Sequence, residues 1–125
     1  MDQVKASGPA EDGPAGYQTL VKSLLSGLAE LVNCRPPAHG AVETLCAFDD
    51  DRGQYLLLKT GWVGDRRVRG TTLYLRLRGG KVWVEEDWTE DGIAAELLKA
   101  GVPREDIVLA FHPPRSRPLT EFATA

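Results

Sequence analysis

Two groups of side chains in this sequence have the types and spacing that could do chemistry. The first lies in TTLYLRLRGGKVWVEE, residues 71–86, where tyrosine, arginine, lysine and tryptophan alternate with apolar residues. The second is the acidic segment EEDWTEDG, residues 85–92. Arginine beside aromatic residues suits contacts with a nucleic acid or with another protein. Grouped carboxylates suit helix capping or a metal-assisted hydrolytic site.

The first group is predicted to form a β-hairpin, because two adjacent glycines, Gly79 and Gly80, favour a two-residue turn between alternating segments. This turn sets Arg78 opposite Lys81, Leu77 opposite Val82, Arg76 opposite Trp83, Leu75 opposite Val84 and Tyr74 opposite Glu85. Side chains then alternate between two faces. Leu73, Leu75, Leu77, Val82 and Val84 share the core side. We call the set on the other side, Tyr74, Arg76, Arg78, Lys81 and Trp83, the aromatic–basic face.

Three interpretations of the aromatic–basic face stay open. It is a solvated sheet face on which Arg76 stacks on Trp83, a cation–π contact of about 0.5–1 kcal/mol. It is the centre of a protein interface, where Trp, Tyr and Arg dominate the binding energy. It binds nucleic acid. Because like charges stand opposite each other at Arg78 and Lys81, the last two interpretations require an acidic partner.

The acidic segment is predicted to begin a helix from Glu90 to about Ala100. Thr89 is placed as its N-cap, and Gly101 ends it. Capping accounts for these carboxylates. A nuclease-like metal site drawing on Glu86, Asp87 and Glu90 is the alternative, but no Lys or His is fixed beside them.

The remaining polar residues suggest no catalytic, metal or cofactor site. His39 and His112, with Cys34 and Cys46, match no zinc-ligand spacing. The two cysteines are expected to be buried as small apolar residues. A cryptic hydrolase using Asp87, Glu90 and His112 is the enzymatic alternative.

The C-terminal residues are expected to form an ordered extension. An apolar run from Ile107 to Phe111 predicts a strand, and His112 at its end is expected to anchor the C-terminal tail. Arg115 and Arg117 lie between prolines in this stiff basic tail. Leu119 and Phe122 are expected to dock the tail onto the domain or a partner. We treat Asp87, Glu90, His112, Arg115 and Arg117 as a candidate motif surface.

These groups require a small α+β framework. Apolar residues at spacings of three and four predict a helix from Tyr17 to about Cys34, and strands are expected over 42–48, 55–62, 68–78 and 81–86. The second of these strands is apolar on both faces and is expected inside the sheet. The predicted fold is a largely antiparallel sheet of four to five strands with two main helices packed on one face. Residues 1–16, rich in glycine and proline, are expected to form a flexible arm before a single domain, 17–125.

Composition limits the function classes. The chain has 125 residues and a formal net charge of -3, which argues against binding nucleic acid through bulk charge. No apolar run is long enough to span a bilayer, and no secretory leader is evident, so we expect a cytoplasmic protein without membrane contact.

The segment KVWVEEDWTEDGIAAELLKAGVPREDIVLAFHPPRSRPLTEFATA, with GW at 61–62 and RVRG at 67–70, resembles the XisI family of fdxN-element excision controlling factors. The resemblance runs from about Tyr17 to Ala125. It implies a non-enzymatic accessory factor that acts with an XisH-like protein and possesses no known catalytic residue. A site-specific recombinase would perform the excision of the DNA element.

The resemblance also bears on partners. XisH itself resembles nuclease-fold proteins, so an antitoxin-like regulator of such a partner is a sharper form of the same role. Because few helices cover the sheet, we expect the aromatic–basic face to form a homodimer or a contact with another protein. Direct DNA binding by this face is the alternative class, and otherwise DNA contact is indirect.

Overall fold

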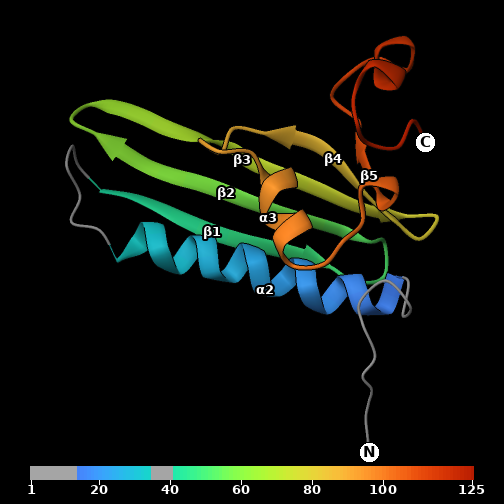
Figure 1. The fold of residues 1–125 in the computed structure, drawn as a ribbon. Coiled ribbons are helices and arrows are strands. Elements are labelled where there is room, and N and C mark those ends of the chain that lie inside the picture. The colour runs from blue at the N-terminus through green and yellow to red at the C-terminus, as the bar shows by residue number, and fades with distance from the viewer. Residues whose placement is uncertain (1–13, 35–40) are drawn as a thin grey trace, which may run out of the picture.

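The computed structural model describes residues 14–34 and 41–125 and shows an α+β fold (Figure 1). The elements are α2 (Pro14–Asn33), β1 (Ala41–Asp49), β2 (Gln54–Val63), β3 (Arg66–Arg78), β4 (Lys81–Asp87), α3 (Ile93–Lys99), the 3₁₀ turn η2 (Arg104–Asp106), β5 (Ile107–Leu109) and the 3₁₀ segment η3 (Pro114–Leu119). The predicted fold class is therefore confirmed.

The five strands lie in the sheet in the order in which they occur along the chain. The first four pair antiparallel through short turns, whereas β5 pairs parallel to β4. A parallel neighbour needs a crossover, and α3 with η2 supplies it. As predicted, β2 is inside the sheet.

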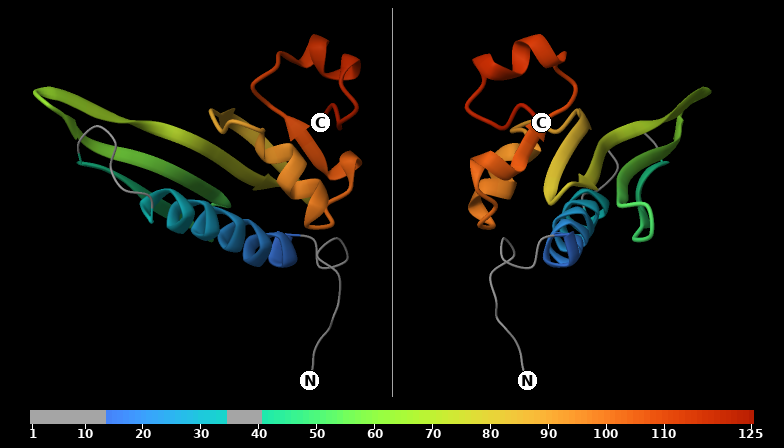
Figure 2. Two further views of the ribbon diagram at one scale, coloured as in Figure 1. Left: turned by 60° about the vertical axis from the view of Figure 1, so that its left-hand side comes forward. Right: turned by 90° about the vertical axis from the view of Figure 1, so that its right-hand side faces the viewer.

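Helices cover one face of the sheet, which we call the inner face (Figure 2). Helix α2 buries Tyr17, Val21, Leu25 and Ala29, one residue in every four, so a single stripe meets the sheet. The predicted core face of the hairpin is confirmed, since Leu73, Leu75, Val82 and Val84 are fully buried beneath the helices and Leu77 packs against this cluster. Burying such side chains stabilises a domain by about 1.5–3 kcal/mol each.

No helix in the described part of the chain covers the opposite face, which we call the outer face (Figure 2). Leu58 follows the buried Leu57 and therefore points to the outer face, as does Leu45, its partner on β1. Leu45 and Trp62 are 41% and 51% exposed. The outer face is thus partly apolar and open at its β1–β2 side.

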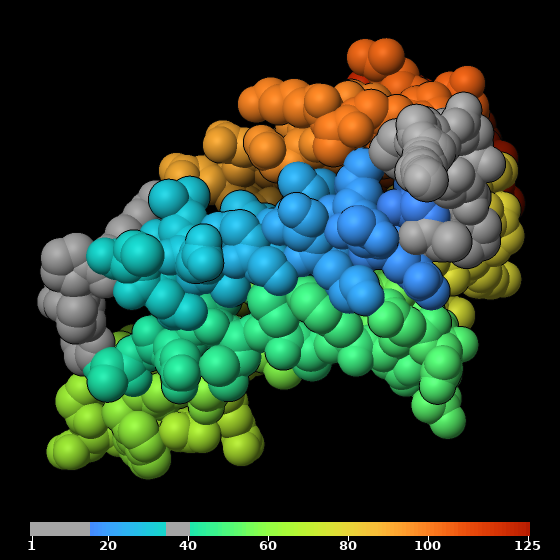
Figure 3. All heavy atoms as spheres, turned by 90° about the horizontal axis from the view of Figure 1, so that it is seen from below, coloured from blue at the N-terminus to red at the C-terminus, as the bar shows by residue number. Residues whose placement is uncertain are grey.

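Helix α2 is tied to β1 and to the turn after it. Seen from below, α2 lies between β1 and the α3 segment (Figure 3). The side-chain amide of Asn33 donates to the carbonyl of Thr44 (2.8 Å) and accepts from its N–H (3.0 Å). Near the middle of the helix, Lys22 pairs with Asp50 (2.8 Å).

Several predicted boundaries differ from the structure. Helix α2 begins at Pro14, inside the expected arm, and the rest of that arm lies outside the described residues, as do Pro36, Pro37 and His39. Strand β5 ends at Leu109 instead of Phe111. The N–H of Ala110 makes the last bond to β4, at the carbonyl of Val84 (2.8 Å), and the carbonyls of Ala110 and His112 accept from Arg117 in the tail.

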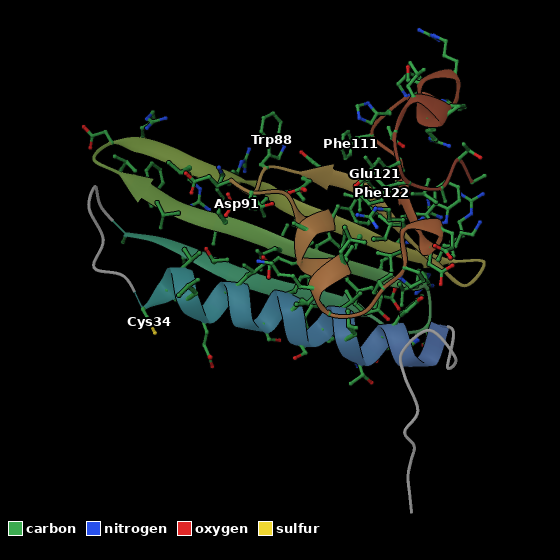
Figure 4. The ribbon with its side chains drawn as sticks, viewed as in Figure 1. Cys34, Trp88, Asp91, Phe111, Glu121 and Phe122 are labelled. Atoms are coloured by element: carbon green, nitrogen blue, oxygen red, sulfur yellow. The ribbon has the colours of Figure 1, made fainter. Side chains whose placement is uncertain are left out.

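The expected burial of the cysteines is wrong. Both are exposed free thiols. Cys34 follows the last turn of α2 and points away from the sheet (Figure 4). The Cys46 thiol lies 3.6 Å from the carbonyl of Leu25, and partial burial raises its pKa. Cys46 sits on an edge strand that α2 covers only in part, which local sequence could not indicate.

Within residues 14–34 and 41–125, no helix is long and apolar enough to cross a membrane.

Candidate functional site

The hairpin between β3 and β4 positions the aromatic–basic face. Arg78 stands opposite Lys81 and Arg76 opposite Trp83, as predicted, so these side chains share the outer face. Gly79 and Gly80 both have positive φ, 59° and 77°, which the two-residue turn requires. The strand register that the glycine pair predicted is therefore correct near the turn.

Farther from the turn the register shifts. Tyr74 stands opposite Glu86, and not opposite Glu85 as predicted, because the ladder has an irregularity between Tyr74 and Leu75. The extra residue, Glu85, bulges from β4 and meets Arg76, with 3.4 Å between Nη1 and Oε2. Arg76 is thus held by a carboxylate on its own sheet.

The expected stacking of Arg76 on Trp83 is wrong. The Arg78 guanidinium lies 4.5 Å from the centre of the Trp83 ring, and the Arg117 guanidinium lies 5.6 Å from it. The indole N–H of Trp83 donates to the carbonyl of Arg78 (3.1 Å). Pairing with Glu85 draws Arg76 away, and two other arginines take its place at the ring.

The C-terminal tail reaches this face through Arg117. Its guanidinium donates to the carbonyls of Ala110, His112 and Thr124 at 3.4, 3.1 and 3.3 Å. Lys81 donates to the main-chain oxygen of Ala125. The tail therefore occupies the Trp83 end of the aromatic–basic face and joins Arg117 of the motif surface to it.

Of the two predicted tail anchors, Phe122 docks onto the domain and Leu119 does not, and docking of Leu119 onto a partner stays a prediction. Phe122 packs against the core cluster, and Ala123 beside it donates to the carbonyl of Ile107 (2.8 Å) (Figure 4). Leu119, in contrast, is 88% exposed. It ends the η3 segment, whose compact 3₁₀ turns direct it away from the sheet.

The acidic corner caps a helix, although not through the predicted residue. Helix α3 begins at Ile93, three residues after the predicted start, and its N-cap Gly92 makes no side-chain cap bond. The carboxylate of Asp87 accepts from the N–H of Ile93 (2.8 Å) and from the N–H of Thr89 (2.9 Å). The Thr89 hydroxyl donates to the Asp87 carboxylate and does not cap the helix. Asp87 is therefore the capping residue.

The other motif-surface residues are dispersed. Glu90 is exposed beside the corner, and Arg115 is exposed in η3. The His112 ring packs on Phe111, with 4.6 Å between ring centres. No hydrogen bond joins His112 to Asp87 or Glu90 in the described residues, and no group of three His, Cys, Asp or Glu there is arranged to hold a metal ion.

Two buried phenols form contacts that the sequence analysis did not predict. Tyr17 donates to Asp106 (2.5 Å), which links α2 to the turn before β5. Tyr55 donates to Asp50 (2.8 Å). Burial, reinforced by these carboxylates, raises the pKa of each phenol well above its ordinary value. Tyr17 and Asp106 are 89 residues apart in sequence, so no local pattern indicated their contact, whereas Tyr55 and Asp50 are five residues apart across the turn between β1 and β2.

A second outer-face region was also missed. A shallow depression is lined by Leu45, Leu58, Lys59, Thr60, Arg69, Gly70 and Thr71. Beside it, Arg67 lies 5.3 Å from the centre of the Trp62 ring and donates to the Thr60 hydroxyl (3.0 Å). The GW and RVRG motifs are thus neighbours on β2 and β3.

The fold and these surfaces define an α+β protein whose sheet is covered by helices on one face and by its own tail at one end of the other. The family model described as XisI protein matches residues 12–124, starting five residues before the expected position. The chain therefore belongs to the XisI family, as its sequence motifs indicated.

Solved structures agree with this assignment. The chain is similar to the fdxN element excision controlling factor XisI from Anabaena variabilis ATCC 29413, with 40% sequence identity and a TM-score of 0.76. It is also similar to a XisI-like protein from the same organism, with 33% identity and a TM-score of 0.79. Each match covers 90% of this chain and 99% of the other. Among proteins with curated descriptions, none matches.

Proposed function

We propose that this chain is a non-enzymatic accessory factor in the controlled excision of a DNA element, acting with an XisH-like protein. The observation that carries the proposal is the match along 99% of a solved excision controlling factor at 40% identity. A regulatory subunit of this kind needs a surface for its partner and requires no catalytic group of its own. An antitoxin-like control of a nuclease-fold partner is one form of this role.

The outer face supports the proposal. Tyr74, Arg76 and Trp83 gather residue types that dominate protein interfaces. Because the tail already covers Trp83, the part of this face that a partner would contact is centred on Tyr74 and Arg76. Arg76 is bound only to Glu85 at 3.4 Å among the described residues, so an acidic partner group can share it.

Co-purification tests the role. The chain would be expressed with an XisH-like protein, either unchanged or as Tyr74→Ala/Arg76→Glu. Trp83 is left intact because it supports Arg117. Lys99→Glu is the control, since Lys99 lies exposed on α3 and pairs only with Glu96 (3.6 Å) among the described residues.

We expect a stable complex with the unchanged chain and with Lys99→Glu, and a complex weakened by at least about tenfold with the double variant. Equal complexes in all three cases would reject this face as the contact. A homodimer with no XisH-like partner bound would reject the role, and it would favour direct DNA binding. Strong salt dependence of binding to duplex DNA would then be expected, because neutralised phosphates release counterions. A site-specific recombinase added to the complex tests the wider assembly.

A further inference from the structure

Part of strand β3 has an open edge. Strand β4 pairs only with Leu73 to Arg78, although β3 begins at Arg66. The N–H of Trp88 donates to the carbonyl of Thr72 (2.8 Å) and marks the boundary. In the described residues no strand pairs with 66–71 on the side away from β2. We call residues 66–71 of β3 the open edge.

The direction of the peptide groups at this edge follows from Asn33. Asn33 bonds both peptide groups of Thr44, so these point away from β2. In an antiparallel ladder the direction alternates, so Glu43 bonds to its partner Thr60 on β2. Thr60 is thereby engaged with β1, and Arg69, its partner on β3, directs its own N–H and C=O away from β2. The open edge therefore offers a donor and an acceptor at Arg69.

Arg67, two residues before Arg69, offers the same groups, and the two side chains share the outer face. The Arg67 guanidinium is held by Thr60 and by the carbonyl of Gly61, at 3.0 and 3.3 Å. Both arginines are exposed, and neither forms an ion pair with a described residue. The open edge thus combines strand-pairing groups with two positively charged residues whose Cα atoms are about 6.6 Å apart along the strand.

Charge selects among possible occupants. Two copies paired through this edge would set arginines against arginines, which is destabilising. Duplex nucleic acid would meet the guanidinium groups but would leave the peptide groups without partners, and Glu86, bonded to the Trp88 indole at 2.7 Å, adds negative charge at the boundary. An extended peptide with carboxylates satisfies both the peptide groups and the charges.

We propose that the open edge of β3 binds an acidic, extended segment of a partner protein by strand addition. Carboxylates at alternate positions of this segment stand opposite Arg67 and Arg69, and main-chain bonds to these residues set the register. An apolar residue at the end near Thr72 packs on Trp88, which is 73% exposed and points away from the sheet (Figure 4). This inference rests on the proposed accessory role in that it specifies what the partner supplies.

A labelled peptide of alternating valine and glutamate tests this inference by fluorescence anisotropy with the full chain. Two control peptides separate the causes of binding. One has lysine in place of glutamate, and the other carries N-methyl groups on alternate amides, which removes donors while keeping the charge. Duplex DNA serves as a competitor at low and high salt.

Three variants test the site. Arg67→Glu/Arg69→Glu reverses the charge, and Arg69→Pro removes the outward N–H without removing a bond to β2. Lys99→Glu is the control for a charge reversal away from the edge. We expect the acidic peptide to bind the unchanged chain and Lys99→Glu equally, and to lose at least about tenfold in affinity with the other two variants. Circular dichroism confirms that each variant is folded.

The outcomes separate this inference from the proposed function. No binding of the acidic peptide, or equal binding of the N-methylated peptide, would overturn strand addition. Displacement of the peptide by DNA at low salt would assign the edge to nucleic acid instead. A homodimer lost in Arg69→Pro would assign it to a second copy.

If the peptide binds as expected while no XisH-like complex forms, strand addition at the open edge is supported and the proposed function is rejected. A complex that survives both edge variants keeps the function and rejects the edge as its contact.

Discussion

The two strand edges at opposite sides of β1–β3 are protected in different ways. At β1, the amide of Asn33 takes both peptide groups of Thr44, as a neighbouring strand would. At the open edge of β3, the peptide groups of Arg67 and Arg69 carry no such cap in the described residues, and positive side chains surround them.

These two kinds of protection have different consequences. At Thr44 the amide cap opposes the pairing of any strand, whatever its charge, because it occupies the hydrogen-bonding groups themselves. A charged edge excludes copies of itself and apolar strands, but it admits a strand of opposite charge. One small sheet thus contains an edge that is capped at one residue and an edge that is selective by charge.

Removing the cap is expected to have the largest effect. In Asn33→Leu the peptide groups of Thr44, which is 8% exposed, lose both partners, at a cost of about 1–3 kcal/mol. The free β1 edge also has Val42, Leu45 and Phe48 exposed by 37–41%, so the variant should self-associate. Light scattering and urea unfolding measure the two effects.

Glu30→Leu is the control for this variant, because it adds similar apolar area to an exposed position of α2 and leaves Thr44 untouched. If Asn33→Leu kept the size and stability of the unchanged chain, the cap would have no protective role.

A smaller effect is expected where the paired part of β3 ends. Asp87 ends β4 and caps α3, so Asp87→Ala should lower the free energy of unfolding by about 1–2 kcal/mol. Amides of α3 should then exchange faster with solvent, and the open edge should extend toward Leu73. Hydrogen exchange measures both changes. Asp91→Ala, at an exposed position of the same corner, should change neither, and equal effects of the two variants would contradict the capping role.

The smallest effect concerns the ion pair between Lys22 of α2, the helix that carries the cap, and Asp50 after β1. Hydrogen bonds from Lys22 and then Tyr55 hold the pKa of the Asp50 carboxyl below its ordinary value of 3.8. A lowered folded-state pKa adds stability above the unfolded pKa, and this stability is lost as the pH falls through the folded pKa. The unchanged chain should therefore lose more stability below about pH 4 than Lys22→Met.

Urea unfolding midpoints across the acid range measure this difference. Lys99→Met is the control, because it removes a lysine from an exposed pair on α3. A difference between Lys22→Met and the unchanged chain that stayed constant with pH would show that Asp50 is not the titrating group.

The local parts of the fold were predictable from sequence, whereas the contacts between distant segments were not. Gly79 and Gly80 indicated the hairpin, and the alternation of apolar with charged and aromatic residues indicated both of its faces. The bulge at Glu85 depends on how β4 meets both α3 and β3, so alternation alone missed it. The same holds for Arg117, whose place at Trp83 depends on the path of a tail that starts 30 residues away in sequence.

The candidate site shows the same division. Sequence identified the residue types of the aromatic–basic face, but it assigned the wrong arginine to Trp83 and the wrong cap to α3. Thr89 has the residue type of a cap, and only the course of the chain shows that Asp87 reaches Ile93 across six residues. The open edge follows from unequal strand lengths, since β3 has 13 residues and β4 has 7, a property that no single segment reveals.

The order of the strands has a consequence for folding kinetics. Each strand pairs with the one before it in sequence, from β1 to β5. No long loop must close before β1 to β4 can pair, whereas β5 needs the crossover through α3 and η2, so the antiparallel part of the sheet should form early in folding. Hairpins can form first and be joined later by α2 and the tail. A chain that assembles in this way exposes its unpaired strands only briefly, which limits aggregation while each new copy folds.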